Sequence, residues 1–208
     1  MKTNILRLVC ATALALAVVS ESVGQEGNRD SRPVRIREIE GMGKKGLVNT
    51  PVYSSSVSGA SRKLREWGQI RVEYQTSKDP RWEWINTLRF KYHVLLMKRT
   101  RDKKREFTML RGDVTYVDVQ GGEEHQSTMF IRPQTIERYG LPVAVHVQIT
   151  PDDGDTTAAD VSEKLSGGAL PEQWWDNDRL DVKDGLLYSR ARSPFALIDI
   201  DNYETIQQ

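Results

Sequence analysis

Apolar residues recur at every second position in three stretches of this chain, and this period of two constrains the fold more than any other feature. In one stretch, Ile70, Val72 and Tyr74 alternate with polar residues, and the same alternation runs through 88–96 and 143–149. A strand with one face in a core and one face in solvent shows this pattern, whereas a strand buried on both faces reads as a continuous apolar run. The chain is therefore predicted to form antiparallel sheets.

The alternation also predicts which side chains of these strands point inward. The outer faces of the second and third stretches would carry polar or small residues, among them His93 and His146. Turns rich in Gly, Pro and Asp separate the stretches, as "SKDP", "QGGEE" and "PDDGD". The expected inward-facing residues are Leu88, Phe90, Tyr92, Val94, Leu96, Val143, Val145, Val147 and Ile149.

The remaining elements are short. Pro133 and Gly140 bracket a segment that fits one short helical turn, and "VRIREIEGMG" reads as a first edge strand. Asp184-Gly185 is placed to turn a hairpin between "RLDV" and "LLYS". Short strands at this spacing fit a sandwich of two sheets, so the predicted fold is an all-β sandwich with one or two short helical turns.

The N-terminus has the layout of a secretory signal peptide. Lys2 and Arg7 precede an apolar run of 12 residues from Leu8 to Val19, and small residues follow. A membrane-spanning helix needs about 20 apolar residues, which makes an uncleaved anchor the weaker alternative. The predicted organisation is a signal peptide at 1–24, a flexible tether at 25–33 and a single sandwich domain at 34–208.

Cleavage after residue 24 changes the charge and the chemistry of the chain. The 30 basic and 29 acidic residues become 28 of each, because Lys2, Arg7 and Glu21 are lost. Cys10, the single cysteine, is lost with them, so the mature chain has no disulfide, no thiolate nucleophile and no sulfur-ligated metal. A neutral mature chain without a broad basic face also argues against nucleic-acid binding.

Three stretches together carry a family resemblance. They are "REWGQIRVEYQT" with the following "PRWEWINTLRFKYHVLL", then "FIRPQTIERYG", and the terminal "SPFALIDIDNYETI". From Val34 to the C-terminus the chain resembles small exported immunoglobulin-like proteins that some Gram-negative bacteria encode alongside type IV pilus and secretion machinery. The resemblance implies an immunoglobulin-like antiparallel β-sandwich and a role in pilus or cell-surface assembly. It transfers no functional residue, and the cysteine pair of antibody domains is absent.

The residues that could perform catalysis form no recognisable pattern. His93, His125 and His146 lie far apart in the sequence, and we expect them at the surface or rim, with a zinc site or a catalytic base as the alternative. There is no Gly-x-Ser-x-Gly motif. We therefore predict a protein that is not an enzyme and has no cofactor. A hydrolase of unfamiliar design would need an acidic residue and a histidine to converge.

Acidic residues gather between positions 151 and 184, where ten Asp and Glu stand against three Lys and Arg. Three runs at 152–155, 176–178 and 199–202 offer the oxygen ligands that calcium prefers. None completes an EF-hand loop. Solvated turns are the favoured interpretation, and structural calcium is the alternative.

Five tryptophans raise the alternative of a carbohydrate-binding module. Trp174 and Trp175 have polar neighbours on both sides and are the pair expected to be partly exposed. Trp82 and Trp84 are two positions apart and could therefore face the same side of a strand. Trp67 precedes a core-facing strand. Core or loop packing is the favoured interpretation for each of them.

The run "KRTRDKKRE" places six basic residues between two predicted strands, where a hairpin tip belongs. Export removes a nuclear role. A solvated turn is the favoured interpretation, and the functional alternatives are contact with an acidic partner, an anionic lipid surface or the acidic patch of a neighbouring copy. We predict an exported protein of the periplasm, outer membrane or cell surface that binds envelope or pilus proteins, with a homo-oligomer or glycan also possible and no transmembrane segment in the mature chain. The candidate interaction residues are Lys98, Arg99, Arg101, Lys103, Lys104, Arg105, Trp174 and Trp175.

Overall fold

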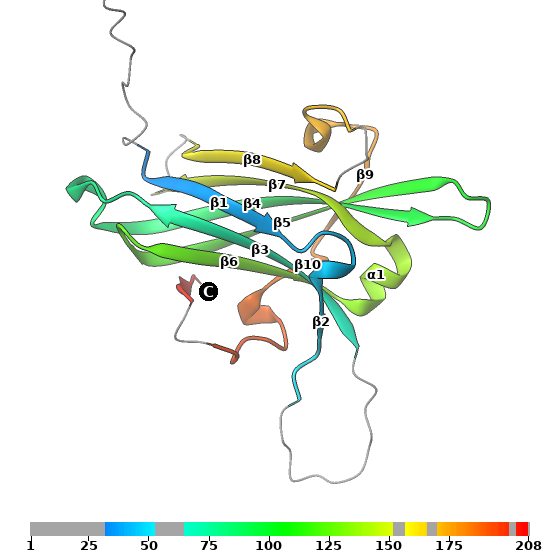
Figure 1. Cartoon of the computed structure of the whole chain (residues 1–208), viewed down its shortest axis with the longest axis horizontal. Helices are drawn as coiled ribbons and strands as arrows, with labels where there is room; N and C mark the ends of the chain where they lie inside the picture. Colours follow the sequence, from blue (N-terminus) through cyan, green and yellow to red (C-terminus); the bar gives the residue numbers. More distant parts are fainter. Residues whose placement is uncertain (1–31, 53–64, 152–156, 166–169, 200–202, 208) are drawn as a thin grey trace, which may run out of the picture.

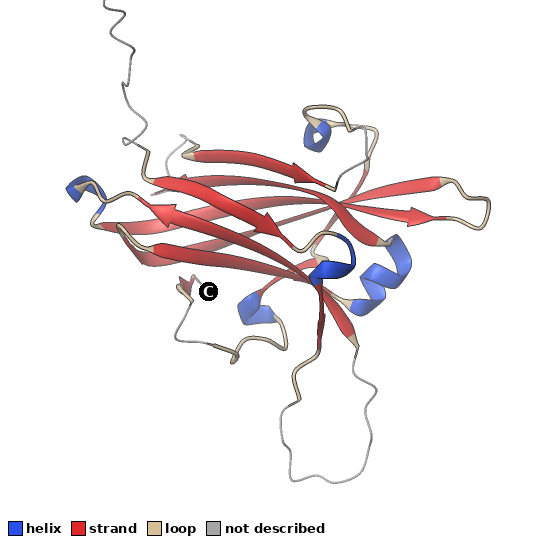
Figure 2. Cartoon of the chain, viewed as in Figure 1, coloured by secondary structure: helices blue, strands red, loops and turns tan. Residues whose placement is uncertain are grey.

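Two β-sheets pack face to face in the computed structural model, which describes residues 32–52, 65–151, 157–165, 170–199 and 203–207. Figure 1 shows the two layers, and Figure 2 shows that strands dominate them. The predicted signal peptide at 1–24 lies outside the described residues, as does most of the tether. The last residue of that tether, Pro33, is buried, and its carbonyl accepts a hydrogen bond from the Ser77 backbone.

The first sheet, sheet A, has its strands in the order β1, β3, β6 and β10, and β2 pairs with β3 beside β1. All of its pairs are antiparallel. The predicted edge strand is present as β1, which carries a register shift between Ile36 and Glu38. The bounds are β1 (Val34–Glu40), β2 (Leu47–Asn49), β3 (Glu66–Thr76), β6 (Glu124–Ile131) and β10 (Leu187–Ser189).

The second sheet, sheet B, has the order β11, β5, β4, β7 and β8, and β9 also pairs with β5. The prediction of antiparallel sheets is right for every described strand pair except one. The exception is the β5–β9 pair, which is parallel. The bounds are β4 (Trp84–Arg99), β5 (Arg105–Gln120), β7 (Leu141–Pro151), β8 (Ala159–Lys164), β9 (Asp181–Asp184) and β11 (Thr205–Ile206).

The core between the sheets contains the side chains that the alternation predicted. Phe90 lies at its centre, where its ring contacts Tyr74, Tyr92 and Tyr116. Val143 is the exception among the predicted inward residues. The β4–β7 register shifts between Leu95 and Leu96, and Val143 packs instead against a small apolar cluster on the other side of sheet B. The all-β sandwich prediction is confirmed.

Short helical turns connect the strands. The predicted turn is α1 (Pro133–Tyr139), and Gly140 ends it at φ 93°, where a Cβ atom would lie 2.1 Å from the Met97 carbonyl oxygen. This position therefore requires glycine. Four 3-10 turns complete the described elements: η1 (Gly43–Gly46), η2 (Pro80–Trp82), η3 (Trp174–Asp176) and η4 (Arg190–Arg192).

The C-terminal third does not form the predicted hairpin. Gly185 does turn the chain, at φ 73°, but β9 before it joins β5 in sheet B while β10 after it joins β6 in sheet A. The chain then returns to β5 as β11. These three short strands switch between the sheets along the side formed by β5 and β6, which leaves those edges paired rather than open.

Candidate functional site

The β4–β5 hairpin ends in an ordered three-residue turn. Strand pairing continues to Arg99 and Arg105, and the Thr100 backbone N–H donates to the Lys104 carbonyl at 2.9 Å. The Lys103 N–H donates to the Thr100 carbonyl at 3.0 Å, and Lys103 has φ 60°. A left-handed residue at the end of such a turn is usually glycine or asparagine, so a lysine here is strained. Figure 1 shows the tip extending past the neighbouring strands.

Five of the six predicted basic residues of this tip are exposed. Lys98 is the exception: it is half-buried, and its Nζ donates to the carbonyl oxygens of Glu137 and Arg138 at the end of α1. A cation at this position satisfies the carbonyl groups that a helix leaves unpaired. Lys98 therefore contacts the end of the helix, and its role as a candidate interaction residue stays a prediction. The exposed cations, none in an ion pair with any residue of the described ranges, are Arg99, Arg101, Lys103, Lys104 and Arg105.

The structure corrects the expected partial exposure for Trp174 but not for Trp175, and both rings are packed, as the favoured interpretation predicted. Trp174 is only 2% exposed, and its Nε1 donates to the Ser162 hydroxyl at 3.1 Å. The half-buried Trp175 stacks flat on His146, with ring centroids 3.7 Å apart and an interplanar angle of 2°. Both rings belong to residues 170–180, which we call the cover segment. It lies over the outer face of sheet B and packs on Leu95, Met109 and Ala144.

His93 and His146 meet beneath this segment. They are paired neighbours on β4 and β7, and their Nδ1 atoms lie 3.1 Å apart. His146 Nε2 lies 2.6 Å from the Asp160 carboxylate on β8. Because a carboxylate only accepts, we assign the proton of His146 to Nε2, which makes its Nδ1 the acceptor of the His93 Nδ1–H.

Burial disfavours the charged form of both rings. The pKa of His93 falls to about 4, chiefly because the ring is buried, and to a lesser degree because His146, Lys91 and Arg111 are nearby. Burial also lowers the pKa of His146, although its hydrogen bond to Asp160 acts in the opposite direction. The pair is therefore neutral at pH 7.

These contacts correct the prediction that the two histidines lie at the surface. The alternation placed them on the outer face of sheet B, as the structure does, but both are buried there, with His146 under the ring of Trp175. An acidic residue and a histidine do converge, yet both ring nitrogens of His146 are already engaged and none is free to activate a nucleophile. Within the described ranges no group of three His, Cys, Asp or Glu side chains could hold a metal.

The outer face of sheet A has a cover of its own. Trp67 is buried there, outside the core, between the rings of Tyr188 and Phe195. Phe195 also stacks on Phe130 at 4.4 Å. Trp67 is thus buried as expected, but by a C-terminal loop and by strand β10 of the same sheet rather than by the opposite sheet.

The third histidine ties the C-terminus to the same sheet. His125 Nδ1 lies 2.6 Å from the Glu204 carboxylate, and its Nε2 lies 2.9 Å from the Gln120 carbonyl. Only 5% of its side chain is exposed, while the residue as a whole is half-buried. His93 and His146 are buried and the side chain of His125 is shielded, and His146 and His125 directly contact residues that follow β8.

The other candidate residues lie apart from these sites. Trp82 packs partly against the core, whereas Trp84 is 56% exposed, so the two do not form one aromatic platform. Of the possible calcium runs, 152–155 and most of 199–202 lie outside the described residues. Asp176 and Asp178 belong to the cover segment, and the calcium alternative stays a prediction.

Comparison with known proteins gives a family and a fold. A protein-family model matches residues 34–208, the span over which the resemblance was expected. The chain belongs to this family. A crystal structure of a protein from Akkermansia muciniphila is similar, with a TM-score of 0.64 and 18% sequence identity over 84% of this chain and 95% of that chain. At this identity the likeness supports the fold alone. No curated protein matches the chain.

Across the residues described, no helix is both long enough and apolar enough to cross a bilayer.

Proposed function

We propose that this family member is an exported, non-catalytic immunoglobulin-like protein that acts by protein–protein contact in a pilus-linked or cell-surface assembly. The exposed cationic tip of the β4–β5 hairpin would bind an acidic surface on its partner. The sequence layout of residues 1–24 supports export. The resemblance to proteins encoded with type IV pilus machinery supports the pilus link.

The observation that carries the proposal is the ordered tip. Two backbone hydrogen bonds hold the turn, and Lys103 keeps a left-handed conformation that lysine does not favour. A preorganised loop loses little conformational entropy on binding, and unpaired surface cations accelerate encounter with an acidic partner. Backbone strain of this kind costs stability and is found mainly at functional sites, which supports a role of the exposed basic tip in recognition.

The alternative, a carbohydrate-binding module, has less support. It required exposed tryptophans, but Trp174 is buried and one face of Trp175 is occupied by His146. Trp84 is exposed without an aromatic neighbour among the described residues. A homo-oligomer stays a prediction, because part of the acidic region at 151–184 lies outside those residues.

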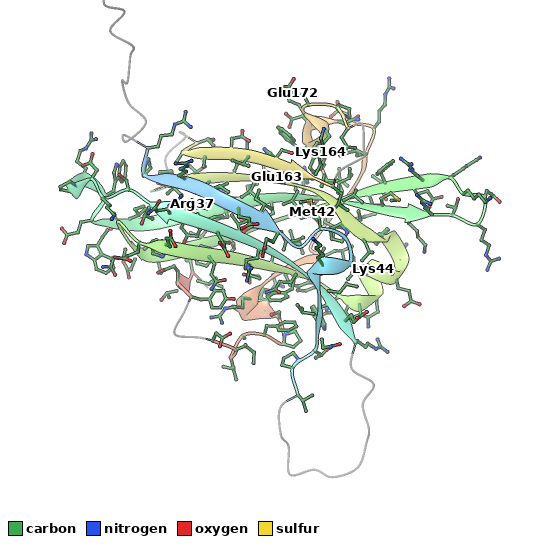
Figure 3. All side chains as sticks on the ribbon, viewed as in Figure 1. Arg37, Met42, Lys44, Glu163, Lys164 and Glu172 are labelled. Atoms are coloured by element: carbon green, nitrogen blue, oxygen red, sulfur yellow. The ribbon has the colours of Figure 1, made fainter. Side chains whose placement is uncertain are left out.

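Charge reversal tests the role of the tip. The triple variant Lys103→Glu, Lys104→Glu, Arg105→Glu is compared with a control of equal charge change, Lys44→Glu, Lys45→Glu, Lys164→Glu. The control residues are exposed, and Figure 3 shows Lys44 and Lys164 away from the tip. Both variants are expected to fold, because surface substitutions usually change stability by less than about 0.5 kcal/mol.

Each purified protein is used as bait on envelope fractions at low and high salt, and captured proteins are quantified by mass spectrometry. We expect the wild type and the control to capture the same partner in a salt-sensitive manner, and the tip variant to capture about tenfold less or lower. Equal capture by the tip variant would show that the hairpin tip is not the contact.

A further inference from the structure

We propose that the His93–His146 pair is an acid-sensitive latch, which holds the cover segment on sheet B at neutral pH and releases it under mildly acidic conditions. A positive charge on the pair is unfavourable while the rings are buried. Exposure to water would remove this cost, and exposure requires the cover segment to lift. The inference does not depend on the proposed function of the hairpin tip.

The geometry makes the pair dependent on the cover. Trp175 lies flat on His146, and Trp174 packs beside it on Leu95, Met109 and Ala144. Asp160 holds His146 Nε2 from β8, a contact that does not involve the cover segment. Movement of residues 170–180 would therefore open to water the face of His146 that Trp175 covers, and His93 contacts that same ring.

The charged groups around the pair come from four elements. Lys91 on β4 and Arg111 on β5 disfavour a positive charge on His93. Asp160 on β8 favours a positive charge on His146, and Asp176 on the cover segment favours it on both rings. Asp176 is the weakest of the influences on His93, and burial is the strongest. The balance favours the neutral pair as long as the cover is closed.

The direction of the pH effect follows from proton binding in the two states. Under the closed cover the pKa of His93 is about 4, and in water a histidine has a pKa of about 6.5. Between these values the open state binds more protons than the closed state, so falling pH favours opening. Above about pH 6.5 both states are neutral at this site, and the latch contributes its full stability.

Opening would expose an apolar surface. Leu95, Met109 and Ala144 lie on the outer face of sheet B at the base of the β4–β5 hairpin, and the cover segment buries all three. Acidification would therefore expose an apolar patch beside the hairpin that carries the basic tip.

Fluorine NMR of protein labelled with 5-fluorotryptophan tests the latch. The signals of Trp174 and Trp175 are assigned from Trp174→Phe and Trp175→Phe, and their exposure is read from the shift difference between H₂O and D₂O. Between pH 8 and pH 4 we expect both signals to become solvent-exposed together, with a midpoint between about 4 and 6.5. The signals of Trp67 and Trp82 should stay unchanged over this range.

Two variants separate the latch from general acid unfolding. His93→Gln keeps a donor for His146 but cannot be protonated, so only His146 is left to take up a proton on opening, and the transition should move to lower pH and become less steep. His125→Gln changes the histidine that contacts Glu204 and should leave the transition in place. The proposal is overturned if Trp174 and Trp175 stay protected to pH 4, if His93→Gln shows the same transition as the wild type, or if all tryptophan signals change at one midpoint.

Discussion

The core between the sheets and the small cluster outside sheet B bury apolar side chains in different ways. In the core, two sheets contribute facing rows, and Phe90 lies among three tyrosine rings without any exposure. Outside sheet B, a row of strand residues is covered by one 3-10 turn and its flanking loop. Hydrogen-bonded strands hold both faces of the core in place. The outer cluster has strands on one face only, and its other face depends on the cover segment.

The two regions also treat polar groups differently. In the core, the hydroxyl groups of Tyr92 and Tyr116 both donate to Ser127, so they are satisfied within the sandwich. Outside sheet B the buried polar groups are ionisable histidines, which are satisfied only while they stay neutral. The outer region is therefore the part of the molecule whose stability should respond to pH.

The largest effect is expected from Phe90→Ala in the core. The cavity and the lost ring contacts should lower the free energy of unfolding by about 3–5 kcal/mol. Urea denaturation followed by circular dichroism measures it. Lys91→Ala, the neighbouring exposed residue, is the control and should change stability by less than about 0.5 kcal/mol at pH 7.5. A loss below about 1 kcal/mol for Phe90→Ala would mean that the core is not packed as described.

A smaller and more local effect is expected from Trp174→Ala. The cover segment can settle into part of the space, so we expect a loss of about 2–3 kcal/mol rather than the full cost of a core tryptophan. Hydrogen exchange should increase in residues 170–180 while β4 and β7 stay protected. Trp84→Ala removes an exposed ring and should leave both measurements unchanged. Equal deprotection of β4 and β7 would contradict the distinction between core and outer cluster.

The smallest effect is expected from Glu204→Gln, which weakens the hydrogen bond between Glu204 and His125. Replacing a charge-assisted hydrogen bond by a neutral one should cost about 1 kcal/mol. The loss should appear as faster hydrogen exchange at residues 205–207, because these pair with β5. Glu124→Gln is the matched control, since that side chain is 74% exposed. Identical exchange in the two variants would show that Glu204 does not hold the C-terminus.

The sequence predicts the strands well because burial against a single core leaves a period of two in the residues themselves. Ile70, Val72 and Tyr74 face the core as expected, and Pro133 and Gly140 bracket α1. Local signals of this kind depend only on backbone geometry and on which side chains avoid water.

The candidate sites could be predicted only in part, because their key contacts join distant residues. His93 and His146 are 53 positions apart, and the alternation marks both as outward-facing without showing that a later segment covers them. The signal that was available is the pair Trp174 and Trp175 with Leu170 and Leu180 nearby, an apolar group with no strand of its own. Lys98 likewise belongs by sequence to a basic run and in space to the end of α1.

The sequence by itself determined that this chain forms a β-sandwich, with an alternating pattern in three stretches and a basic turn between β4 and β5. The tertiary structure alone decided that the C-terminal third packs on both outer faces, contacts His125 and His146 and pairs with the edges of β5 and β6. The physical reason is that alternation records only whether a strand has a buried face. Which distant segment lies on the other face depends on packing between residues that no local pattern connects.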